Sequence, residues 1–351
     1  MSLNPSSAGP RNVSGSVFLV AILITAGVAV AATAGYYTLF PAAVGGPPGP
    51  HVTVLDDSDR TVTAPVNATR IVVLAPNVMD LVYRLNLRDR VVGIGCTTGI
   101  AGGMLNEYTP NQTTDWNLTP AMCITDFPTL DTETIANLST QLVLASTLTY
   151  ASDVATLTDT FHIPVVILAP ADLGGIITDV RLLAELFPVV GTTALSLEAH
   201  LGAILNNASD LVTSLSYNDT PAPSVLLTYY FYEDGYGAYG QNSFGESLVA
   251  LAGGNSISSN LTFEYADLNA TVVLSDQPNV ILYGTSWNDE WIVDGQDPGA
   301  WTSSAPYWSQ LNGTKIPVDV TLITEPDASM IFYLPWLEHW FYPTIVPAPL
   351  A

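Results

Sequence analysis

The chain has 351 residues, with 8 Lys and Arg against 32 Asp and Glu, so its formal net charge is −24 at neutral pH. Acids are present at an ordinary share and bases are scarce, which argues against partners that need clustered Lys or Arg, namely nucleic acids, anionic lipid headgroups and polyphosphates. A hydrophobic content of 48% supports one large or two medium domains with real cores and excludes a disordered chain.

The first apolar segment covers residues 17–40 and carries no charge, which is long enough to cross a bilayer of about 30 Å as a helix. Arg11 precedes it, which favours an N-terminus inside the cell. A cleaved signal peptide is the alternative, although its apolar run is usually shorter. We expect a cytoplasmic segment at 1–16, an anchor at 17–40, a stiff Pro/Gly linker at 41–51, and a body on the extracellular face of the cell membrane, or secreted if cleavage occurs.

The body contains several N-x-S/T sequons, which accept N-linked glycans on exported proteins. We therefore expect a glycoprotein. The sequons begin at Asn67, Asn111, Asn117, Asn137, Asn207, Asn218, Asn260, Asn269 and Asn312.

Scarce bases in an exported chain also indicate what lies outside the cell. With all carboxylates protonated, the 8 bases and 4 histidines would bring the net charge to about +12 in place of −24, so self-repulsion would stay modest. We interpret the composition as that of an acidophile's outer surface, and of an archaeon in view of the sequons.

The folded body begins with a strand-like entry and an apolar run at 70–76 that is typical of a buried parallel strand. Asn77 is expected to cap a helix over 77–87, and strand character returns at 90–95. The same order recurs up to residue 170. This alternation predicts an N-terminal α/β lobe with a mostly parallel sheet over residues 52–192.

Two helices follow at 173–187 and 193–217, the second about 30 Å long at 1.5 Å per residue. A C-terminal α/β lobe is expected over residues 218–351. Its predicted elements are a strand at 224–232, helices at 243–254 and 265–274, a strand at 279–284 and a final helix around 330–342. The sequence thus predicts two Rossmann-like lobes joined by one long helix.

Three segments carry a family resemblance: RIVVLAPNVMDLVYRLNLRDRVVGIG, PTLDTETIANLSTQLVLA and GQNSFGESLVALAGGNSI. In this order they resemble the solute-binding proteins of ABC importers for cobalamin and ferric siderophores, over roughly residues 70–343. That family usually has Glu where Asp80 stands. The resemblance implies a rigid connecting helix, capture of a ligand between the lobes with modest closure, and delivery to a membrane permease driven by a separate ATPase. It implies no enzymatic activity and no cofactor.

Ligand sites of open α/β sheets lie beyond the carboxyl ends of the strands. The loops expected there are rich in aromatic residues, whose faces and polar tips suit a large, flat, mostly neutral ligand. Packing of alternate tyrosines along a strand is the alternative for residues 228–240. The candidate ligand-binding residues are Asn77, Tyr108, Trp116, Tyr150, Tyr230, Tyr232, Tyr236, Tyr239, Trp287 and Trp291.

The scarcity of bases also bears on the ligand. A multiply anionic catecholate complex would need several Lys or Arg, and the C-terminal lobe has only Lys315. A neutral corrinoid or a neutral ferric complex fits better, with cobalamin as the leading candidate. A metal-ion binder is an alternative, but the four histidines are too scattered to predict a metal site. A surface-anchored hydrolase is a further alternative, although the G-x-S-x-G, P-loop and H-E-x-x-H motifs are absent from the sequence.

Two further expectations complete the set. Proteins of the resembling family dock on their permease through one acidic residue on each lobe, and by position these are Glu107 and Glu246. Cys96 and Cys123 are the only cysteines. In an oxidising exterior they are expected to form a disulfide, with two free thiols as the alternative.

Overall fold

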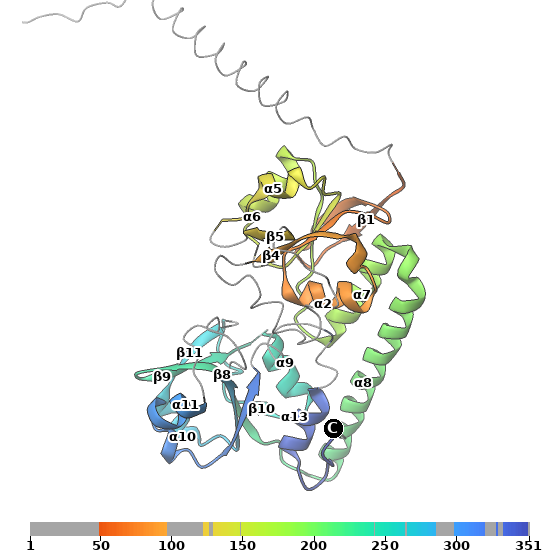
Figure 1. Cartoon of the computed structure of the whole chain (residues 1–351). Helices are drawn as coiled ribbons and strands as arrows, with labels where there is room; N and C mark the ends of the chain where they lie inside the picture. The colour runs from red at the N-terminus through yellow and green to blue at the C-terminus, as the bar shows by residue number, and fades with distance from the viewer. Residues whose placement is uncertain are drawn as a thin grey trace, which may run out of the picture. The chain divides into compact units, whose positions relative to one another are not determined.

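The computed structural model describes residues 49–96, 122–125, 129–147, 149–241, 243–263, 265–285, 298–319, 328 and 333–349. The chain divides into two units, 1–48 and Gly49–Ala351, and all described residues belong to the second (Figure 1). The predicted anchor and most of the predicted linker lie outside the described residues.

The N-terminal lobe is built on a five-stranded, wholly parallel sheet in the order β5-β4-β3-β6-β7. Parallel strands need crossover connections, and helices supply those from β3 to β4, from β5 to β6 and from β6 to β7. The strands are β3 (Ile71–Val73), β4 (Val91–Cys96), β5 (Cys123–Thr125), β6 (Leu142–Ala145) and β7 (Val165–Ile167). The helical elements are α2 (Pro76–Arg84), η1 (Arg88–Arg90), α5 (Thr132–Asn137), α6 (Ala151–Ala155), the π-helix η3 (Thr156–Thr160) and α7 (Leu173–Leu186).

Helices cover both faces of this sheet, because successive strand residues point to opposite sides. Ile71 and Val73 of β3 pack in one cluster with α2 and α7. Val72, between them, packs in another with α5, α6 and η3. All three residues are fully buried. This explains why the strand reads as an unbroken apolar run, with no alternation of polar and apolar residues.

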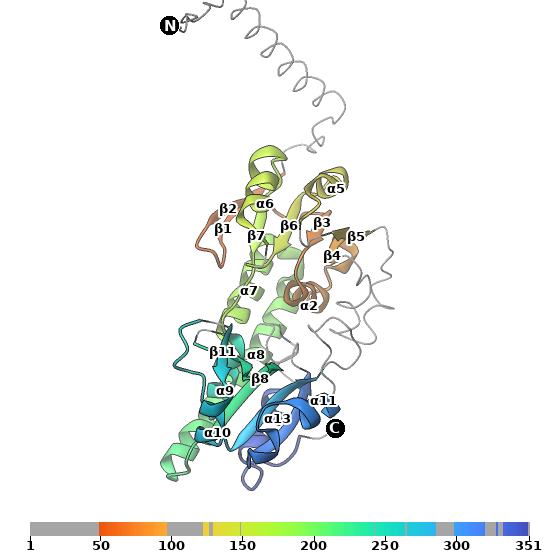
Figure 2. The ribbon, with the colours of Figure 1, turned by 90° about the vertical axis from the view of Figure 1, so that its left-hand side faces the viewer.

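A two-stranded antiparallel hairpin, β1 (His51–Leu55) and β2 (Thr61–Pro65), lies beside the edge strand β7 (Figure 2). Its turn supplies hydrogen bonds to the open edge. The Asp56 carboxylate accepts from the N–H of Ile167 at 3.1 Å, the N–H of Asp57 donates to the Ile167 carbonyl at 3.1 Å, and Arg60 Nη2 donates to the Val165 carbonyl at 3.1 Å. Buried backbone groups of a sheet edge must be paired, and the hairpin turn pairs them here.

The connecting helix α8 (Gly191–Tyr217) follows α7 and a single turn, η4 (Pro188–Val190), and runs alongside both lobes (Figure 1). Its buried residues are Ala194, Leu201, Ala208 and Leu215. They recur every seventh position, so they form one narrow row along the helix, the spacing of a coiled-coil seam. Among the described residues, Pro188–Tyr217 is the one helical stretch with the length and hydropathy of a membrane span; its buried row packs within the protein core.

The C-terminal lobe contains a six-stranded mixed sheet in the order β11-β9-β8-β12-β13, with β10 pairing the first residues of β8. The strands β8, β10, β12 and β13 are parallel, whereas β9 and β11 are antiparallel to their neighbours. The strands are β8 (Ser224–Tyr232), β9 (Gly235–Tyr239), β10 (Asn255–Ser256), β11 (Tyr265–Asn269), β12 (Val280–Thr285) and β13 (Thr314–Asp319).

Helices again cover both faces. One face of β8 and β12 packs on α8, α9 (Phe244–Leu251) and α13 (Leu334–Phe341). The other packs on α10 (Ala270–Asp276), α11 (Pro298–Ser304) and η5 (Trp308–Gln310). The first of these clusters is continuous with the α2 and α7 side of the N-terminal lobe through α8. The two lobes therefore share one apolar layer, which resists a wide hinge motion.

The predicted architecture of two α/β lobes joined by a long helix is confirmed, and two local predictions are wrong. Residues 265–269 form strand β11 in place of a helix, because they pair with β9, and α10 begins only at Ala270. Asn77 does not cap α2. The helix begins at Pro76, whose fixed φ suits the first turn, and Ala75 takes the capping position without a side-chain bond.

Candidate functional site

Five of the twelve predicted ligand-binding and docking residues lie outside the described residues. These are Tyr108, Trp116, Trp287 and Trp291 among the ligand candidates, and Glu107 of the docking pair. The remaining ligand candidates lie in three places, and only Tyr230, Tyr232 and Tyr239 are brought together on one face.

The tyrosines of β8 stand at its carboxyl end, beyond the part that pairs with β12. Here the register with β9 shifts between Thr228 and Tyr230, so that Tyr229 is the extra residue of a bulge. The buried Thr228 hydroxyl lies within hydrogen-bond distance of two carbonyls, those of Gly237 at 2.7 Å and Tyr230 at 3.0 Å. The bulge re-aims the tyrosines that follow, as bulges near binding sites often do.

Glycines on β9 make room for these rings. A Cβ on Gly237 would collide with the rings of Tyr230 and Tyr229, and a Cβ on Gly235 would collide with the ring of Tyr232. The rings of Tyr230 and Tyr232 therefore lie across the bare backbone of the neighbouring strand, and both glycines are buried beneath them. This is the known use of glycine where close approach to a backbone is needed.

The result is a continuous band of four tyrosines on one face of the β8–β9 hairpin, hereafter the tyrosine face: Tyr229, Tyr230, Tyr232 and Tyr239. Ring centroids are 5.0 Å apart for Tyr239 and Tyr229, 4.7 Å for Tyr229 and Tyr230, and 5.8 Å for Tyr230 and Tyr232. Tyr239 is buried at one end, while the other three are half-buried. The band therefore runs from the core to the surface.

An acidic residue from the adjacent strand completes the tyrosine face. Tyr230 Oη donates to an oxygen of Asp267 at 2.8 Å, and Asp267 lies opposite Gly237 in the β9–β11 ladder. Desolvation raises the pKa of Tyr230, and its hydrogen bond to Asp267 raises it further. Desolvation also raises the pKa of Tyr229 and Tyr232. The phenols thus remain neutral hydrogen-bonding groups across the physiological range.

Tyr236 lies on the opposite face of β9 and belongs to the core. It is fully buried, stacks near Trp301 with ring centroids 6.4 Å apart, and donates its hydroxyl to the Pro306 carbonyl. Trp301 in turn donates to the Gly284 carbonyl at 2.9 Å. Tyr236 is therefore a core residue that packs within the lobe, as the alternative for the tyrosines of residues 228–240 has it. Successive side chains along a strand point to opposite faces, so Tyr239, three positions later, lies on the other face from Tyr236.

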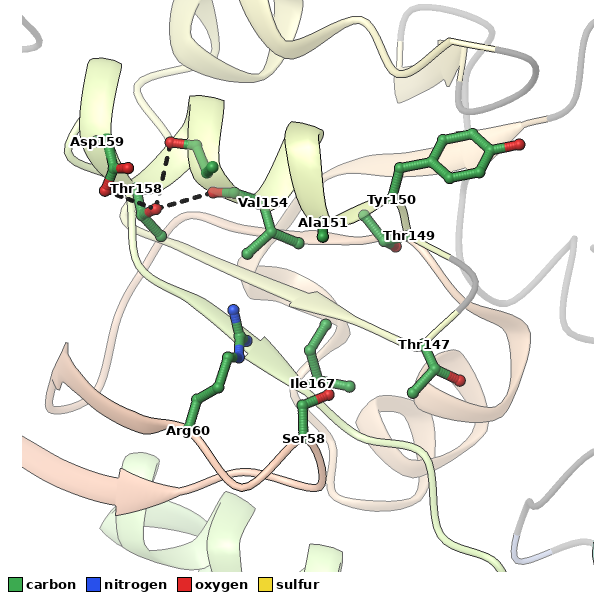
Figure 3. Close-up of a pocket in the computed structure, with 11 residues that line it drawn as sticks. Ser58, Arg60, Thr147, Thr149, Tyr150, Ala151, Val154, Thr158, Asp159 and Ile167 are labelled. Carbon is green, nitrogen blue, oxygen red and sulfur yellow. Dashed lines mark hydrogen bonds between the residues drawn. The ribbon is translucent and has the colours of Figure 1, made fainter.

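Asn77 and Tyr150 lie in the N-terminal lobe. Asn77 is buried, and its amide donates to the Leu168 carbonyl at 3.2 Å. Tyr150 precedes α6 and is 52% exposed. It borders a hollow of about 540 Å³ between α6 and the β1–β2 turn, which also includes Arg60 (Figure 3).

Every described base has a partner within the protein, although Arg88 and Arg181 form their pairs at the surface. Arg70 and Arg90 donate to backbone carbonyls, and so does Lys315. The other four pair with carboxylates: Arg60 with Asp56, Arg84 with Asp80, Arg88 with Asp89, and Arg181 with Glu198. The few bases that this chain retains are thus committed to structure, which leaves little positive charge for an anionic ligand. Among the described residues, no group of three or more His, Cys, Asp or Glu is placed to hold a metal ion.

Two other predicted residues are described. Glu246 is half-buried in the first turn of α9, where its N–H is capped by the Ser243 hydroxyl at 3.1 Å. Cys123 is disulfide-bonded, and Cys96 is the only other cysteine of the chain. The strands that carry them, β4 and β5, are neighbours in the sheet.

Residues 71–299 match the model of the family described as periplasmic binding protein. The chain belongs to this family. The matched range begins at β3 of the N-terminal lobe and ends in α11, so it includes the connecting helix and the tyrosine face.

Relatives of this periplasmic binding protein agree with the assignment. It is 26% identical to a cobalamin-binding protein of Halobacterium salinarum over 287 residues, which cover 76% of this chain and 69% of the relative. Among solved structures, the TroA-like periplasmic binding protein FepB of Veillonella parvula superposes with a TM-score of 0.65 at 17% identity, covering 85% of this chain and 92% of that one. The periplasmic heme-binding protein RhuT of Roseiflexus gives 0.59 at 20%, covering 79% and 99%. These two structures support the fold.

Proposed function

We propose that this periplasmic binding protein captures a cobalamin-like corrinoid outside the cytoplasm and delivers it to the permease of an ABC importer, driven by a separate ATPase. The observation that supports this ligand class is the tyrosine face, a continuous aromatic band of neutral phenols at the carboxyl end of β8. The similarity to a cobalamin-binding relative points the same way.

The chemistry of the tyrosine face fits such a ligand. A corrinoid is large and flat, and its periphery carries neutral amide groups. Tyrosine rings bury large apolar area at little entropic cost, and their hydroxyls can exchange hydrogen bonds with amides. A polyanionic ligand would lack partners, since all described bases already bind carbonyls or carboxylates.

A neutral ferric complex is the second candidate, because phenol oxygens also bind iron. The raised pKa of Tyr230 counts against direct ligation through this residue, because forming the phenolate costs more where desolvation and Asp267 both oppose the charge. We therefore place corrinoids first. Binding of a ferric complex without binding of cobalamin would reverse this order.

Titration calorimetry with cyanocobalamin, ferrioxamine B and haemin tests the proposal directly. We expect cyanocobalamin to bind with a Kd of about 1 μM or tighter, which corresponds to about −8 kcal/mol. Tyr230→Ala should weaken binding by about tenfold, the effect of losing one aromatic contact. Tyr217→Ala is the matched control, since Tyr217 is 89% exposed at the end of α8. No heat from cyanocobalamin at micromolar concentrations would refute the ligand.

The site of action follows from the N-terminal segment. We propose that residues 17–40 anchor the protein in the cell membrane with the body outside. Detergent phase separation of the native protein, followed by mass determination of its N-terminus, tests this. An N-terminus starting near residue 40 would show cleavage and secretion in place of anchoring.

Docking on the permease is proposed to use Glu107 and Glu246. The partly buried carboxyl of Glu246 lies in the first turn of α9. The double variant Glu107→Ala and Glu246→Ala should abolish transport while corrinoid affinity stays unchanged. Normal transport by this variant would reject the pair.

We also propose that the protein is an archaeal surface glycoprotein exposed to acid. Asn207 on α8 and Asn260 before β11 are exposed sequon residues, and are the preferred sites. Asn67 is half-buried with a φ of 57° and is disfavoured. Intact-mass analysis of native protein tests this, and glycan on Asn67 alone would contradict the ranking.

A further inference from the structure

The hollow beside Tyr150 and Arg60 lies in the N-terminal lobe and shares no residue with the tyrosine face. It measures about 540 Å³, within the range of small-molecule sites. Figure 3 shows its arrangement. Ser58 and Arg60 come from the β1–β2 turn, the α6–η3 helix forms the opposite wall, and Ile167 of β7 lies between them.

The turn that forms one wall is held firmly. The buried carboxylate of Asp56 accepts hydrogen bonds from the N–H groups of Ser58 at 3.1 Å and Arg60 at 3.0 Å. It also accepts two from the Arg60 guanidinium, from Nε at 3.1 Å and Nη2 at 2.5 Å. This paired geometry fixes the plane of the guanidinium. The wall is therefore preorganised, which reduces the entropic cost of binding.

The same turn also contacts α7 through two neighbouring carboxyl groups, those of Asp57 and Asp179. Asp57 accepts from the N–H of Ala169 at 2.6 Å, and Asp179 of α7 lies beside it, fully buried. No described N–H or O–H group donates to either oxygen of Asp179. A negative charge on the buried Asp179 would be desolvated and repelled by the exposed carboxylate of Asp57, so Asp179 keeps its proton and can donate it to Asp57. Burial and Asp57 together raise the pKa of Asp179 to about 9.

The lining combines an apolar floor with a ring of polar groups. Ala151, Val154 and Ala155 make the helical wall apolar, and Ile167 supplies the apolar floor between the two walls. Hydroxyls of Ser58, Thr147, Thr149 and Thr158 border it, together with the exposed ring of Tyr150 and the carboxylate of Asp159. In the described part of the chain, Arg60 Nη1 meets no acceptor, while Nε and Nη2 are both used. Figure 3 shows the guanidinium reaching from the turn towards the helix.

The charges that line the hollow limit which classes of ligand it can bind. Arg60 is neutralised by Asp56, and the remaining ionisable carboxyl is that of Asp159 on the rim, so a phosphate or another polyanion would meet no net positive charge. A fixed guanidinium nitrogen, a carboxylate, several hydroxyls and an aromatic ring instead suit a neutral ligand with many hydroxyl groups and one apolar face. We propose that this hollow is a second binding site, for a neutral polyhydroxylated solute of the size of a hexose.

Saturation-transfer NMR on the full chain tests the proposal, with glucose, galactose and N-acetylglucosamine as probes and inorganic phosphate as the anionic comparison. We expect at least one sugar to bind at about millimolar affinity and phosphate not to bind. Ala155→Trp would fill the hollow from an exposed helical position. It should weaken sugar binding by at least about tenfold. Ala199→Trp, on the exposed side of α8, is the matched control and should bind like the wild type.

Each other outcome overturns the proposal. No sugar binding by the wild type, equal binding by Ala155→Trp and the wild type, or binding of phosphate alone would each do so. Displacement of the sugar by cyanocobalamin would show that the hollow is not a separate site. Calorimetry with cyanocobalamin on the same variants measures binding at the tyrosine face separately. The sugar site and the corrinoid site can therefore be tested independently of each other.

Discussion

The carboxylate of Asp80 accepts a hydrogen bond from the backbone N–H of Ala328 at 3.1 Å, across 248 positions of the sequence. Asp80 lies on α2 of the N-terminal lobe, and it also receives Arg84 Nε on both oxygens, at 2.9 and 2.7 Å. Burial raises the pKa of Asp80, while Arg84 and the Ala328 N–H oppose this shift. One buried side chain thus ties the N-terminal lobe to the segment that follows β13.

Removing this carboxylate should destabilise the protein strongly. Asp80→Ala leaves Arg84 without its partner and Ala328 without its acceptor, and breaking a buried pair typically costs about 3–5 kcal/mol. Asp80→Asn keeps an oxygen that can accept from the Ala328 N–H, so its free energy of unfolding should fall clearly less. Urea unfolding measures both, and hydrogen exchange at Ala328 should accelerate only in Asp80→Ala. Equal losses in the two variants would show that the backbone bond contributes nothing.

Stability should fall as pH rises, because of Asp179. Below about pH 4 its carboxyl is protonated in both folded and unfolded states and contributes no difference. Above that, the unfolded chain releases the proton, while the folded protein, with a pKa of about 9, keeps it. The free energy of unfolding should therefore drop by up to about 1.4 kcal/mol per pH unit until the folded pKa is reached.

The matching measurement is the Tm between pH 4 and pH 8 for the wild type and Asp179→Asn. The amide can still donate to Asp57 but does not ionise, so its Tm should vary less with pH. Asp210→Asn, at an exposed position of α8, should follow the wild type. A wild-type Tm that is higher at pH 8 than at pH 4 would contradict the account.

The tyrosine face should depend on glycine at position 237. A methyl group in Gly237→Ala would strike the rings of Tyr230 and Tyr229, costing about 1–3 kcal/mol through overpacking and weakening corrinoid binding. Gly202→Ala, on α8, meets no atom within 4 Å and should stabilise by about 0.5–1 kcal/mol. Thermal unfolding and calorimetry measure the two effects. Unchanged ligand affinity in Gly237→Ala would separate the tyrosine face from the ligand.

The row of four buried residues along α8, spaced seven positions apart, should carry most of that helix's packing energy. Leu201 is fully buried, and Leu201→Ala should cost about 2–5 kcal/mol through the cavity it leaves. Leu195→Ala removes the same atoms from a side chain that is 67% exposed and should change stability by less than about 0.5 kcal/mol. Denaturant midpoints of the pair test this, and similar losses would show that the row is not special.

Much of the fold could be predicted from sequence, because unbroken apolar runs and helical periodicity are local signals. The sequence predicts a helix at residues 265–269, where the structure has a strand, because this short mix of polar and apolar residues, Asp267 and Asn269 with Ala266 and Leu268, also fits a helical turn. Pairing with β9 decides its conformation, and pairing is a long-range property that a single segment does not display.

The site was predictable in part for the same reason. An aromatic cluster at 229–239 is visible in the sequence, yet which rings share a face depends on the bulge after Thr228. Counting by two would have separated Tyr236 from Tyr239, but it would not have revealed the bulge. The alternating glycines at 235 and 237 were the available signal for rings lying across a strand. The hollow beside Arg60 and the Asp57–Asp179 pair join segments that are distant in sequence, so no local pattern marks them.

The hairpin beside β7 has a consequence for the behaviour of the protein in concentrated solution. Exposed sheet edges recruit other chains, and proteins commonly block them with lysine. A chain with so few bases has little lysine to use, and here a turn with two aspartates and one arginine occupies the edge of β7. Proteolysis of that turn, or removal of all residues up to Pro65, would leave the apolar edge strand β7 open to a second copy of the chain. Self-association should follow.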